Sequence, residues 1–259
     1  MARMPDGFVD MTLTSPPYDN LRTYNNNIDK TWNQDIWQEV IKSLYRITKQ
    51  GGIVVWIVND ATINGSETGT SFKQALYAME VGFSLHDTMI YHKSGLTYPE
   101  TNRYFPSFEY MFIFSKGKPS VCNQIKDKYN VTNGNKNVGT ERKKDGTTKK
   151  KHGAIHNKVR PLYSVRQNVW TYATGQNNNS KDAISFNHPA IFPEKLAADH
   201  IYSWSNEGDL VYDPFMGSGT TAKMAHIYKR KWIGSEINAE YVELANKRIE
   251  AYINQLTLF

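Results

Sequence analysis

The stretch LVYDPFMGSGTT, residues 210–221, decides the fold of this chain. Residues 210–212 have strand character, Gly217 and Gly219 mark a loop, and residues 220–228 are predicted to form a helix. Glycine permits positive φ angles and close approach of a ligand, and a helix start offers free N–H groups. The arrangement is typical of a nucleoside-binding loop. No Gly-Lys-Ser/Thr follows, which argues against a phosphate-binding P-loop.

An acidic residue strengthens this interpretation. The next predicted strand, residues 231–235, ends at Glu236. In doubly wound folds a carboxylate at this position accepts hydrogen bonds from ribose hydroxyls. A lone glycine loop is as often a structural turn, but the strand–loop–helix–strand–Glu context favours a cofactor site.

Strands and helices alternate over both ends of the chain. The run 53–58 is apolar throughout, which is typical of a strand covered on both faces. Gly51-Gly52 is expected to end the helix before it. The alternation predicts an α/β domain with a doubly wound, mostly parallel sheet. The other predicted strands cover 8–13, 85–92 and 110–114, and the other predicted helices cover 35–49, 71–81, 194–204 and 239–256.

The middle of the chain lacks this alternation and is basic. Between Cys122 and Arg160 there are eleven Lys and Arg against three Asp and Glu, a net charge of +8. The whole chain carries +6, so the remainder carries −2. A local excess of positive charge is typical of a surface that binds a polyanion, although a solvated loop would look the same.

Composition excludes several other classes. A single cysteine, Cys122, leaves no disulfide framework and no cysteine-rich metal site, so no metal is expected. No apolar stretch approaches the roughly 20 residues that span a bilayer, and residues 1–10 lack an apolar signal core. We therefore expect a soluble, cytoplasmic protein.

The glycine loop belongs to a recognisable set of motifs. Residues 213–221 resemble the S-adenosyl-L-methionine-binding motif of bacterial and phage DNA amino-methyltransferases. Residues 188–193, HPAIFP, resemble the other cofactor-flanking segment of that family, and residues 14–18, TSPPY, resemble its catalytic motif. Catalytic motif first and cofactor motif last is the permuted order of the β class. The resemblance covers nearly the whole chain except the middle, where such enzymes diverge.

This resemblance implies roles for individual residues. Glu236 would hold the ribose of the cofactor and Ile237 would pack on its adenine. His188, Phe192 and Pro193 would close the pocket. Contacts with the rest of the cofactor are expected from the glycine loop, namely from Asp213, Pro214, Phe215, Gly217, Ser218, Gly219 and Thr220.

The proline motif suits chemistry on an exocyclic amine. Such an amine is a poor nucleophile because its lone pair is delocalised into the ring. The Ser15 Oγ and the Pro16 carbonyl could accept its two hydrogens and move the nitrogen toward sp³ geometry, while Pro17 helps to hold the backbone rigid. Tyr18 would stack on a base that has left the duplex. Alone, the motif could also be a strand-ending turn.

The first residue of the proline motif bears on the identity of the target base. In the family, Ser at the first position of the motif is associated with cytosine N4 and Asp with adenine N6, so Ser15 favours cytosine. Methylation of cytosine at C5 needs a nucleophilic cysteine. The single cysteine, Cys122, lies far along the chain from the proline motif, which argues against that reaction. Three alternatives remain: adenine N6, a non-catalytic nucleic-acid-binding module of the same fold, and methylation of RNA or a protein amide.

The expected organisation is a catalytic and cofactor-binding domain with a target-recognition insertion. The domain covers 1–115 and 188–259, and the insertion covers 116–187. Double-stranded DNA is the expected partner, while a homodimer and a cognate restriction endonuclease stay open. The expected DNA contacts are Lys143, Lys144, Lys149, Lys150, Lys151, Arg160 and Arg166.

Overall fold

The computed structural model describes residues 1–18, 32–95, 102–136, 139–150, 158–175, 179–187 and 191–254 of the 259-residue chain. His188 and Lys151, both expected at functional sites, lie outside these ranges. The chain forms two compact units: unit 1 is Met1–Asn123 with Asn168–Phe259, and unit 2 is Gln124–Gln167. Among the described helices, none is long and apolar enough to cross a membrane.

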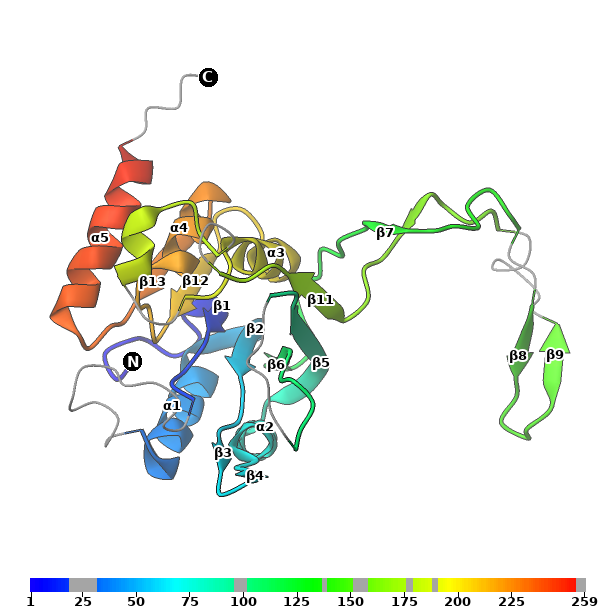
Figure 1. Ribbon diagram of the computed structural model, residues 1–259, viewed down its shortest axis with the longest axis horizontal. Coiled ribbons are helices and arrows are strands. Elements are labelled where there is room, and N and C mark those ends of the chain that lie inside the picture. Colours follow the sequence, from blue (N-terminus) through cyan, green and yellow to red (C-terminus); the bar gives the residue numbers. More distant parts are fainter. Residues whose placement is uncertain are drawn as a thin grey trace. The chain divides into compact units, whose positions relative to one another are not determined.

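A seven-stranded sheet forms the centre of unit 1 (Figure 1). Six strands are parallel to one another, and β6 runs antiparallel to both of its neighbours. This confirms the mostly parallel sheet. In spatial order the strands are β11 (Val169–Tyr172), β5 (Ser84–Lys93), β6 (Phe108–Ser115), β2 (Thr48–Val58), β1 (Val9–Thr14), β12 (Leu210–Asp213) and β13 (Lys231–Gly234).

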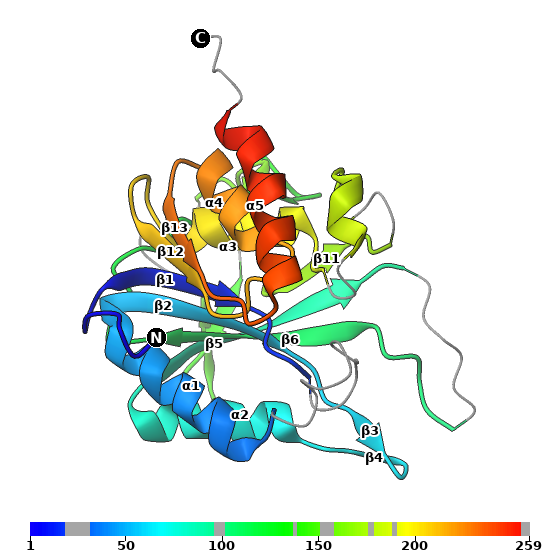
Figure 2. The same ribbon diagram turned by 90° about the vertical axis from the view of Figure 1, so that its left-hand side faces the viewer.

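Helices cover both faces of the sheet, as Figure 2 shows. On one face lie α1 (Gln34–Ile47) and α2 (Thr70–Val81), and on the other lie α3 (Glu194–Trp204), α4 (Thr220–Ile227) and α5 (Ala239–Ile253). The chain runs from β1 through α1 to β2 on one side, and from β12 through α4 to β13 on the other. The winding therefore reverses between β1 and β12, where doubly wound sheets bind their ligands.

The apolar runs of the sequence build this arrangement. On β2, Val54, Trp56 and Val58 are buried against α1 and α2, while Ile53, Val55 and Ile57 alternate with them and are buried as well. The indole N–H of Trp56 donates to Gln74 Oε1 of α2 at 2.9 Å, so the buried polar atom is satisfied. Burial on both faces of the sheet explains why residues 53–58 are all apolar instead of alternating between apolar and polar.

The prediction that Gly51-Gly52 ends the first helix was wrong. Helix α1 ends at Ile47 and β2 begins at Thr48, so the glycines lie inside the strand. The pairing of β2 with β1 shifts register here. Gly51 has φ +80°, and a Cβ on Gly52 would lie 2.9 Å from the Asp10 carbonyl oxygen. The glycines permit an irregular strand start that side chains would block.

The basic middle of the chain contains more order than its sequence indicates. Strand β11 lies within the range 116–187, yet it pairs in parallel with β5 at the edge of the main sheet. Unit 2 holds two short antiparallel pairs, and the range 116–187 as a recognition insertion stays a prediction. The remaining elements are β3 (Thr62–Ile63), β4 (Ser66–Glu67), β7 (Lys128–Tyr129), β8 (Thr140–Arg142), β9 (Thr148–Lys150), β10 (Tyr163–Ser164) and the 3₁₀ turn Ala183–Asn187.

Both ends of unit 1 at the boundary with unit 2 are tied down. Asn123 donates its backbone N–H to the Ser203 carbonyl at 2.8 Å and its side-chain amide to the Tyr202 carbonyl at 3.0 Å, both on α3. The Asn168 carbonyl accepts from the Ile90 N–H of β5 at 2.8 Å. Cys122, directly before Asn123, is exposed.

Candidate active site

The catalytic and cofactor motifs meet at the carboxyl ends of β1 and β12. These strands are parallel neighbours, with Thr12 opposite Tyr212. The Thr14 hydroxyl donates to Asp213 Oδ1 at 2.7 Å, and the Thr221 hydroxyl donates to Asp213 Oδ2 at 2.7 Å. Although nearly 200 residues separate them in sequence, the two loops are joined by a buried carboxylate.

Asp213 is held behind the glycine loop rather than exposed to solvent. Its Oδ1 also accepts from the Phe215 backbone N–H at 3.0 Å, and its side chain is buried. Burial raises the pKa of Asp213 to about 6, although the hydrogen bonds from Thr14, Thr221 and Phe215 act in the opposite direction. The carboxylate therefore fixes the loop from inside, and its predicted contact with the cofactor stays a prediction.

The proline motif leads into a chain of polar groups. Ser15 Oγ lies 2.7 Å from Tyr18 Oη, and the Tyr18 hydroxyl donates to Glu109 Oε2 of β6 at 2.9 Å. Lys93, at the end of β5, donates to Glu109 Oε1 at 2.7 Å. The Tyr18 ring is partly buried against the core cluster beneath the sheet, so its predicted stacking on a base stays a prediction.

The direction of these hydrogen bonds follows from Lys93. A carboxylate that is paired with an ammonium is ionised and can only accept. Tyr18 therefore spends its single hydroxyl hydrogen on Glu109, and the Ser15 hydroxyl must donate to Tyr18 Oη. Both lone pairs of the Ser15 Oγ are then left to accept hydrogens from another group.

The glycine loop has the backbone that its sequence predicts. Gly217 has φ +49° and Gly219 φ +80°, both in the left-handed region, and Gly219 begins α4. Glu236 Oε2 accepts from the Gly217 N–H at 2.9 Å. Its Oε1 accepts from the Ile237 and Asn238 N–H groups, both at 2.9 Å.

These contacts leave Glu236 capacity for a ligand. An ionised carboxylate has about four acceptor positions, of which three are used here. The Ile237 side chain beside it is 82% exposed, which is unusual for an aliphatic residue and suits an apolar ring packed on it. Pro214 and Ser218 are buried and Phe215 is half-buried, so Phe215 is the residue of this loop that is most accessible to solvent.

A buried charged cluster supports the outer side of the loop. Arg248 of α5 donates to the Ser218 carbonyl at 3.0 Å and to Thr220 Oγ1 at 3.0 Å. The same guanidinium forms ion pairs with Asp182 at 2.8 Å and Glu194 at 2.6 Å. We call Arg248, Lys223, Asp182 and Glu194 the charged cluster, because Lys223 also bridges both carboxylates, at 2.8 and 2.7 Å.

The cluster is neutral and strongly coupled. Burial alone opposes ionisation of Asp182, but hydrogen bonds from Arg248, Lys223 and Tyr252 outweigh it and hold the pKa at about 2. Through these bonds the cluster joins the glycine loop to Asp182 and Glu194, which come before and after the second predicted cofactor segment in the sequence. Within that segment Pro193 is buried at the start of α3 and Phe192 is half-buried.

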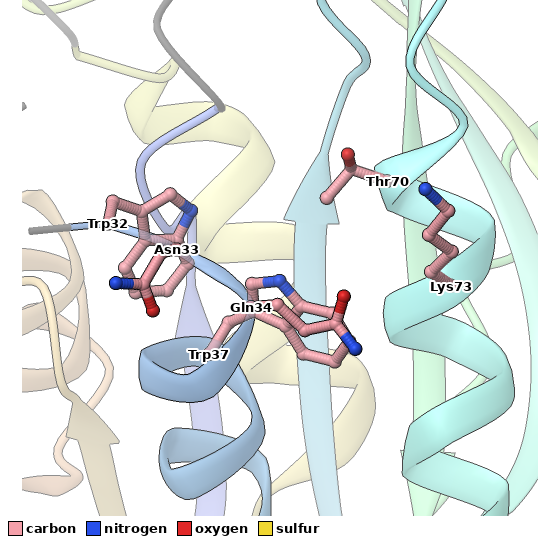
Figure 3. A pocket seen from close by; sticks show the side chains of 6 residues that line it. All are labelled: Trp32, Asn33, Gln34, Trp37, Thr70 and Lys73. Atoms are coloured by element: carbon pink, nitrogen blue, oxygen red, sulfur yellow. The ribbon is translucent and has the colours of Figure 1, made fainter. Parts of the chain in front are cut away.

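A small cavity of about 130 Å³ lies between the starts of α1 and α2 (Figure 3). Figure 3 shows Trp32 and Trp37 on one side, and Thr70 and Lys73 on the other. Trp32 also contacts the glycine loop, since its ring meets Phe215 edge-on at 5.3 Å. Trp32 thus both lines the cavity and contacts the glycine loop.

The residues expected to contact DNA lie in unit 2. Lys143, Lys144, Lys149 and Lys150 are exposed, and Lys149 pairs with Glu141 at 2.8 Å. Arg166 forms an ion pair with Asp127 and Arg160 donates to Thr132, so both arginines also hold unit 2 together. Among the described residues, no group of three His, Cys, Asp or Glu is arranged to hold a metal ion.

Sequence reasoning missed several residues of this site. Lys93 and Glu109 each lie one residue outside a predicted strand, 85–92 and 110–114 respectively, where nothing distinguishes them from solvated charges. Arg248 lies on an amphipathic helix among other charged residues. Thr14 was the accessible signal, because it is the first residue of the motif TSPPY.

Comparison with known proteins gives a consistent result. A sequence model of a family described as DNA methylase matches residues 9–247. The orphan methyltransferase M.BamHII of Bacillus amyloliquefaciens is 53% identical, and the match covers 96% of this chain and 91% of that protein. The DNA adenine methyltransferase YhdJ of Escherichia coli is 26% identical, with 96% of this chain and 79% of that protein covered.

Solved structures share the fold. The PvuII DNA methyltransferase, which is cytosine-N4-specific, has a TM-score of 0.66 at 21% identity over 95% of this chain and 81% of that chain. A protein of Thermus thermophilus described as a DNA modification methylase, solved with S-adenosyl-L-methionine, has a TM-score of 0.62 at 20% identity over 98% and 90%. These likenesses confirm the predicted Rossmann-like methyltransferase fold.

Proposed function

Since this chain belongs to the DNA methylase family that modifies exocyclic amino groups, we propose that it transfers a methyl group from S-adenosyl-L-methionine to N4 of cytosine in double-stranded DNA. The preference for cytosine rests on the identity of Ser15, and the observation that supports transfer to an exocyclic amine of either base is the orientation of the Ser15 hydroxyl. Its hydrogen is directed to Tyr18, so its lone pairs are available to an incoming amine. Ser at this position favours cytosine, and Asp, the alternative in the family, would favour adenine.

The arrangement suits direct transfer to a neutral amine. Ser15 Oγ and the Pro16 carbonyl would each accept one amine hydrogen. This draws the nitrogen lone pair out of conjugation with the ring and directs it toward the methyl group of the cofactor. The pairing of Glu109 with Lys93 fixes the Ser15 hydroxyl in the accepting orientation before the base arrives. Once methylated, the nitrogen is strongly acidic, so its proton can pass to solvent without a dedicated base.

The cofactor fits the residues at the end of β12 and β13. S-adenosyl-L-methionine carries a methyl group activated by its positive sulfonium. Glu236 has an acceptor position left for a ribose hydroxyl, and Ile237 offers an exposed apolar surface for adenine. The left-handed glycines at 217 and 219 set the backbone of the loop, and Gly219 also leaves room for Ala245 and Ile249 of α5. As proposals, Phe192 and Pro193 close the pocket from the α3 side.

Nucleoside mass spectrometry tests the proposed base. Duplex DNA from a methylase-deficient host is incubated with the protein and methyl-labelled cofactor, then digested to nucleosides. The expected product is N4-methyldeoxycytidine, and a Ser15→Ala protein should form it at least about tenfold more slowly because one acceptor is lost. Labelled N6-methyldeoxyadenosine would overturn the choice of base, which the resemblance to an adenine methyltransferase keeps as the alternative. No incorporation into any nucleic acid would favour a non-catalytic binder.

A further inference from the structure

Unit 2 contains a β-hairpin whose turn is held by several hydrogen bonds. Strands β8 and β9 pair antiparallel, with Arg142 opposite Thr148 (Figure 1). The Gly146 N–H donates to the Lys143 carbonyl at 3.0 Å, and the Lys143 N–H donates to the Thr147 carbonyl at 2.7 Å. Gly146 has φ +84°, the left-handed residue that a three-residue hairpin loop requires.

The acidic residue of the tip is used internally. Asp145 Oδ1 accepts from the Thr147 N–H at 2.9 Å and from its hydroxyl at 2.6 Å. These hydrogen bonds lower the pKa of Asp145, so it stays ionised and bound to the turn. These hydrogen bonds preorganise the turn, although no part of the hairpin is buried.

The hairpin has no core of its own. Residues 140–150, TERKKDGTTKK, contain no aliphatic or aromatic side chain, and every residue of both strands is exposed. An isolated two-stranded hairpin is at best marginally stable in water. The turn is well defined although both strands are polar and exposed. This combination indicates that the hairpin binds a partner rather than packing against the rest of the chain.

The two faces of the hairpin differ in charge. Strand alternation places Thr140, Arg142, Thr148 and Lys150 on one side, which we call the cationic face, and it holds no carboxylate. The opposite side, which we call the paired face, carries Lys143 and the Glu141–Lys149 ion pair. In the part of the chain that the structure describes, neither Arg142 nor Lys150 has a carboxylate partner.

We propose that the β8–β9 hairpin enters the major groove of duplex DNA with its cationic face toward the base edges. The major groove, about 12 Å wide, admits a two-stranded β-ribbon. Arg142, near the tip, has the fork that binds guanine O6 and N7, and Thr140 and Thr148 can donate to or accept from neighbouring bases. Lys150, farther from the tip, would contact phosphate. The inference deepens the proposed function, since it takes DNA as the substrate.

Two matched double variants test the orientation. Arg142→Gln with Lys150→Gln changes the cationic face, and Lys143→Gln with Lys149→Gln removes the same two charges from the paired face. Binding of the full-length protein to a labelled duplex is measured by fluorescence anisotropy over a salt series. The cationic-face variant should lose about tenfold or more in affinity, with a salt slope smaller by about one, because Lys150 is the residue of this face that contacts phosphate. Lys143 and Lys149 are among the DNA contacts expected from the sequence, but the proposed orientation turns both away from the bases. The paired-face variant should therefore lose less than about threefold, since only long-range attraction changes.

Equal losses in the two variants, or a larger loss on the paired face, would overturn the orientation. The groove is tested separately with dimethyl sulfate, which modifies guanine N7 in the major groove and adenine N3 in the minor groove. The parent protein should protect guanine N7, and the cationic-face variant should lose that protection. Protection of adenine N3 instead would contradict the proposal.

Both measurements are binding experiments that need no methyl transfer. If the parent protein binds and protects DNA but forms no methylated nucleoside, the proposed function fails and the hairpin proposal stands. If it methylates cytosine but the two variants bind alike, the hairpin proposal fails alone. Melting temperatures equal to that of the parent protein would show that both variants are folded.

Discussion

Asp213 illustrates how one buried side chain can join two loops that are far apart in the sequence. It accepts hydrogen bonds from both motif loops, yet its burial raises its pKa to about 6. A carboxyl whose pKa is raised in the folded state stabilises the protein most below its unfolded pKa, near 4. That contribution is lost as the pH rises through 6.

Replacing Asp213 by Asn should remove this pH dependence. Asn keeps an acceptor for Thr14 and Phe215, and its amide can donate to Thr221 in place of the bond now accepted. We expect the difference in unfolding free energy between parent and variant to change by about 3 kcal/mol between roughly pH 4 and pH 7, with the parent losing stability. Urea unfolding at several pH values measures it. A constant difference would contradict the raised pKa.

Glu109 should affect turnover rather than cofactor affinity. In Glu109→Gln the amide can donate to Tyr18, which would reverse the hydrogen bonds and turn the Ser15 hydrogen toward the substrate. We expect kcat to fall by about tenfold, or roughly 1.4 kcal/mol of activation free energy, with the KM for S-adenosyl-L-methionine unchanged. Tyr18→Phe should act in the same direction.

Steady-state kinetics with both substrates varied separates these parameters. Glu39→Gln on α1 is a matched control, because it removes an exposed carboxylate paired with Lys42. An increase in the cofactor KM at constant kcat would show that Glu109 shapes the cofactor pocket instead.

The sequence predicts the motifs of the site but not the residues between them. Ser15, the glycines and Glu236 are recognisable because their chemistry depends on local spacing along the chain. Glu109 and Lys93 become significant only when β5 and β6 bring them beside Tyr18, a contact that spans 91 residues. Pairings of this kind depend on strand order, which no local pattern encodes.

At the scale of elements, the charged cluster fastens α5 and α3 to the cofactor loop. Arg248→Met would leave Asp182 and Glu194 with Lys223 alone, which under-compensates two largely buried carboxylates. Removing one partner of a buried ion pair typically costs about 3–5 kcal/mol. We expect a loss of stability in that range and a weaker affinity for S-adenosyl-L-methionine, because Ser218 and Thr220 lose their anchor.

Arg230→Met provides the comparison. Arg230 is also buried, but its hydrogen bonds go to Ser205 and to the Tyr228 carbonyl, so its removal leaves no carboxylate buried alone. Its cost should be smaller, and cofactor affinity measured by calorimetry should not change. Equal effects of the two variants would show that the cluster has no special role at the loop.

Elements differ in how well local pattern predicts them. Helix α3 has the predicted bounds, and α1 and α4 differ from theirs by only one or two residues at each end, because amphipathic spacing and loop residues mark their ends. Strand β11 was not recognised, since four residues within a polar stretch become a strand only by pairing with β5. The Gly51-Gly52 signal was misread because a positive φ serves a strand irregularity as well as a helix end.

At the scale of the whole molecule, positive charge is concentrated in one unit. Unit 2 has twelve Lys and Arg against three Asp and Glu, a net charge of +9, so the rest of the chain carries −3. Between about 50 and 200 mM salt we expect duplex affinity to fall on the order of 1,000-fold as counterions compete for phosphate. Cofactor affinity should change little over the same range.

Anisotropy for DNA and calorimetry for the cofactor, on one protein preparation, make this comparison. A flat salt response for DNA would locate the main contact outside the basic unit. The oligomeric state, which the sequence leaves open, is a separate question that light scattering with and without DNA answers.

The anchored boundary beside Cys122 has a practical consequence. The chain has one cysteine, it is exposed, and the next residue is fastened to α3 by backbone and side-chain hydrogen bonds. A thiol-reactive fluorophore would therefore attach at a single defined point at the root of the basic unit, without prior removal of other thiols. The protein thus offers a single labelling position from which the response of the basic unit to added duplex DNA can be followed in real time.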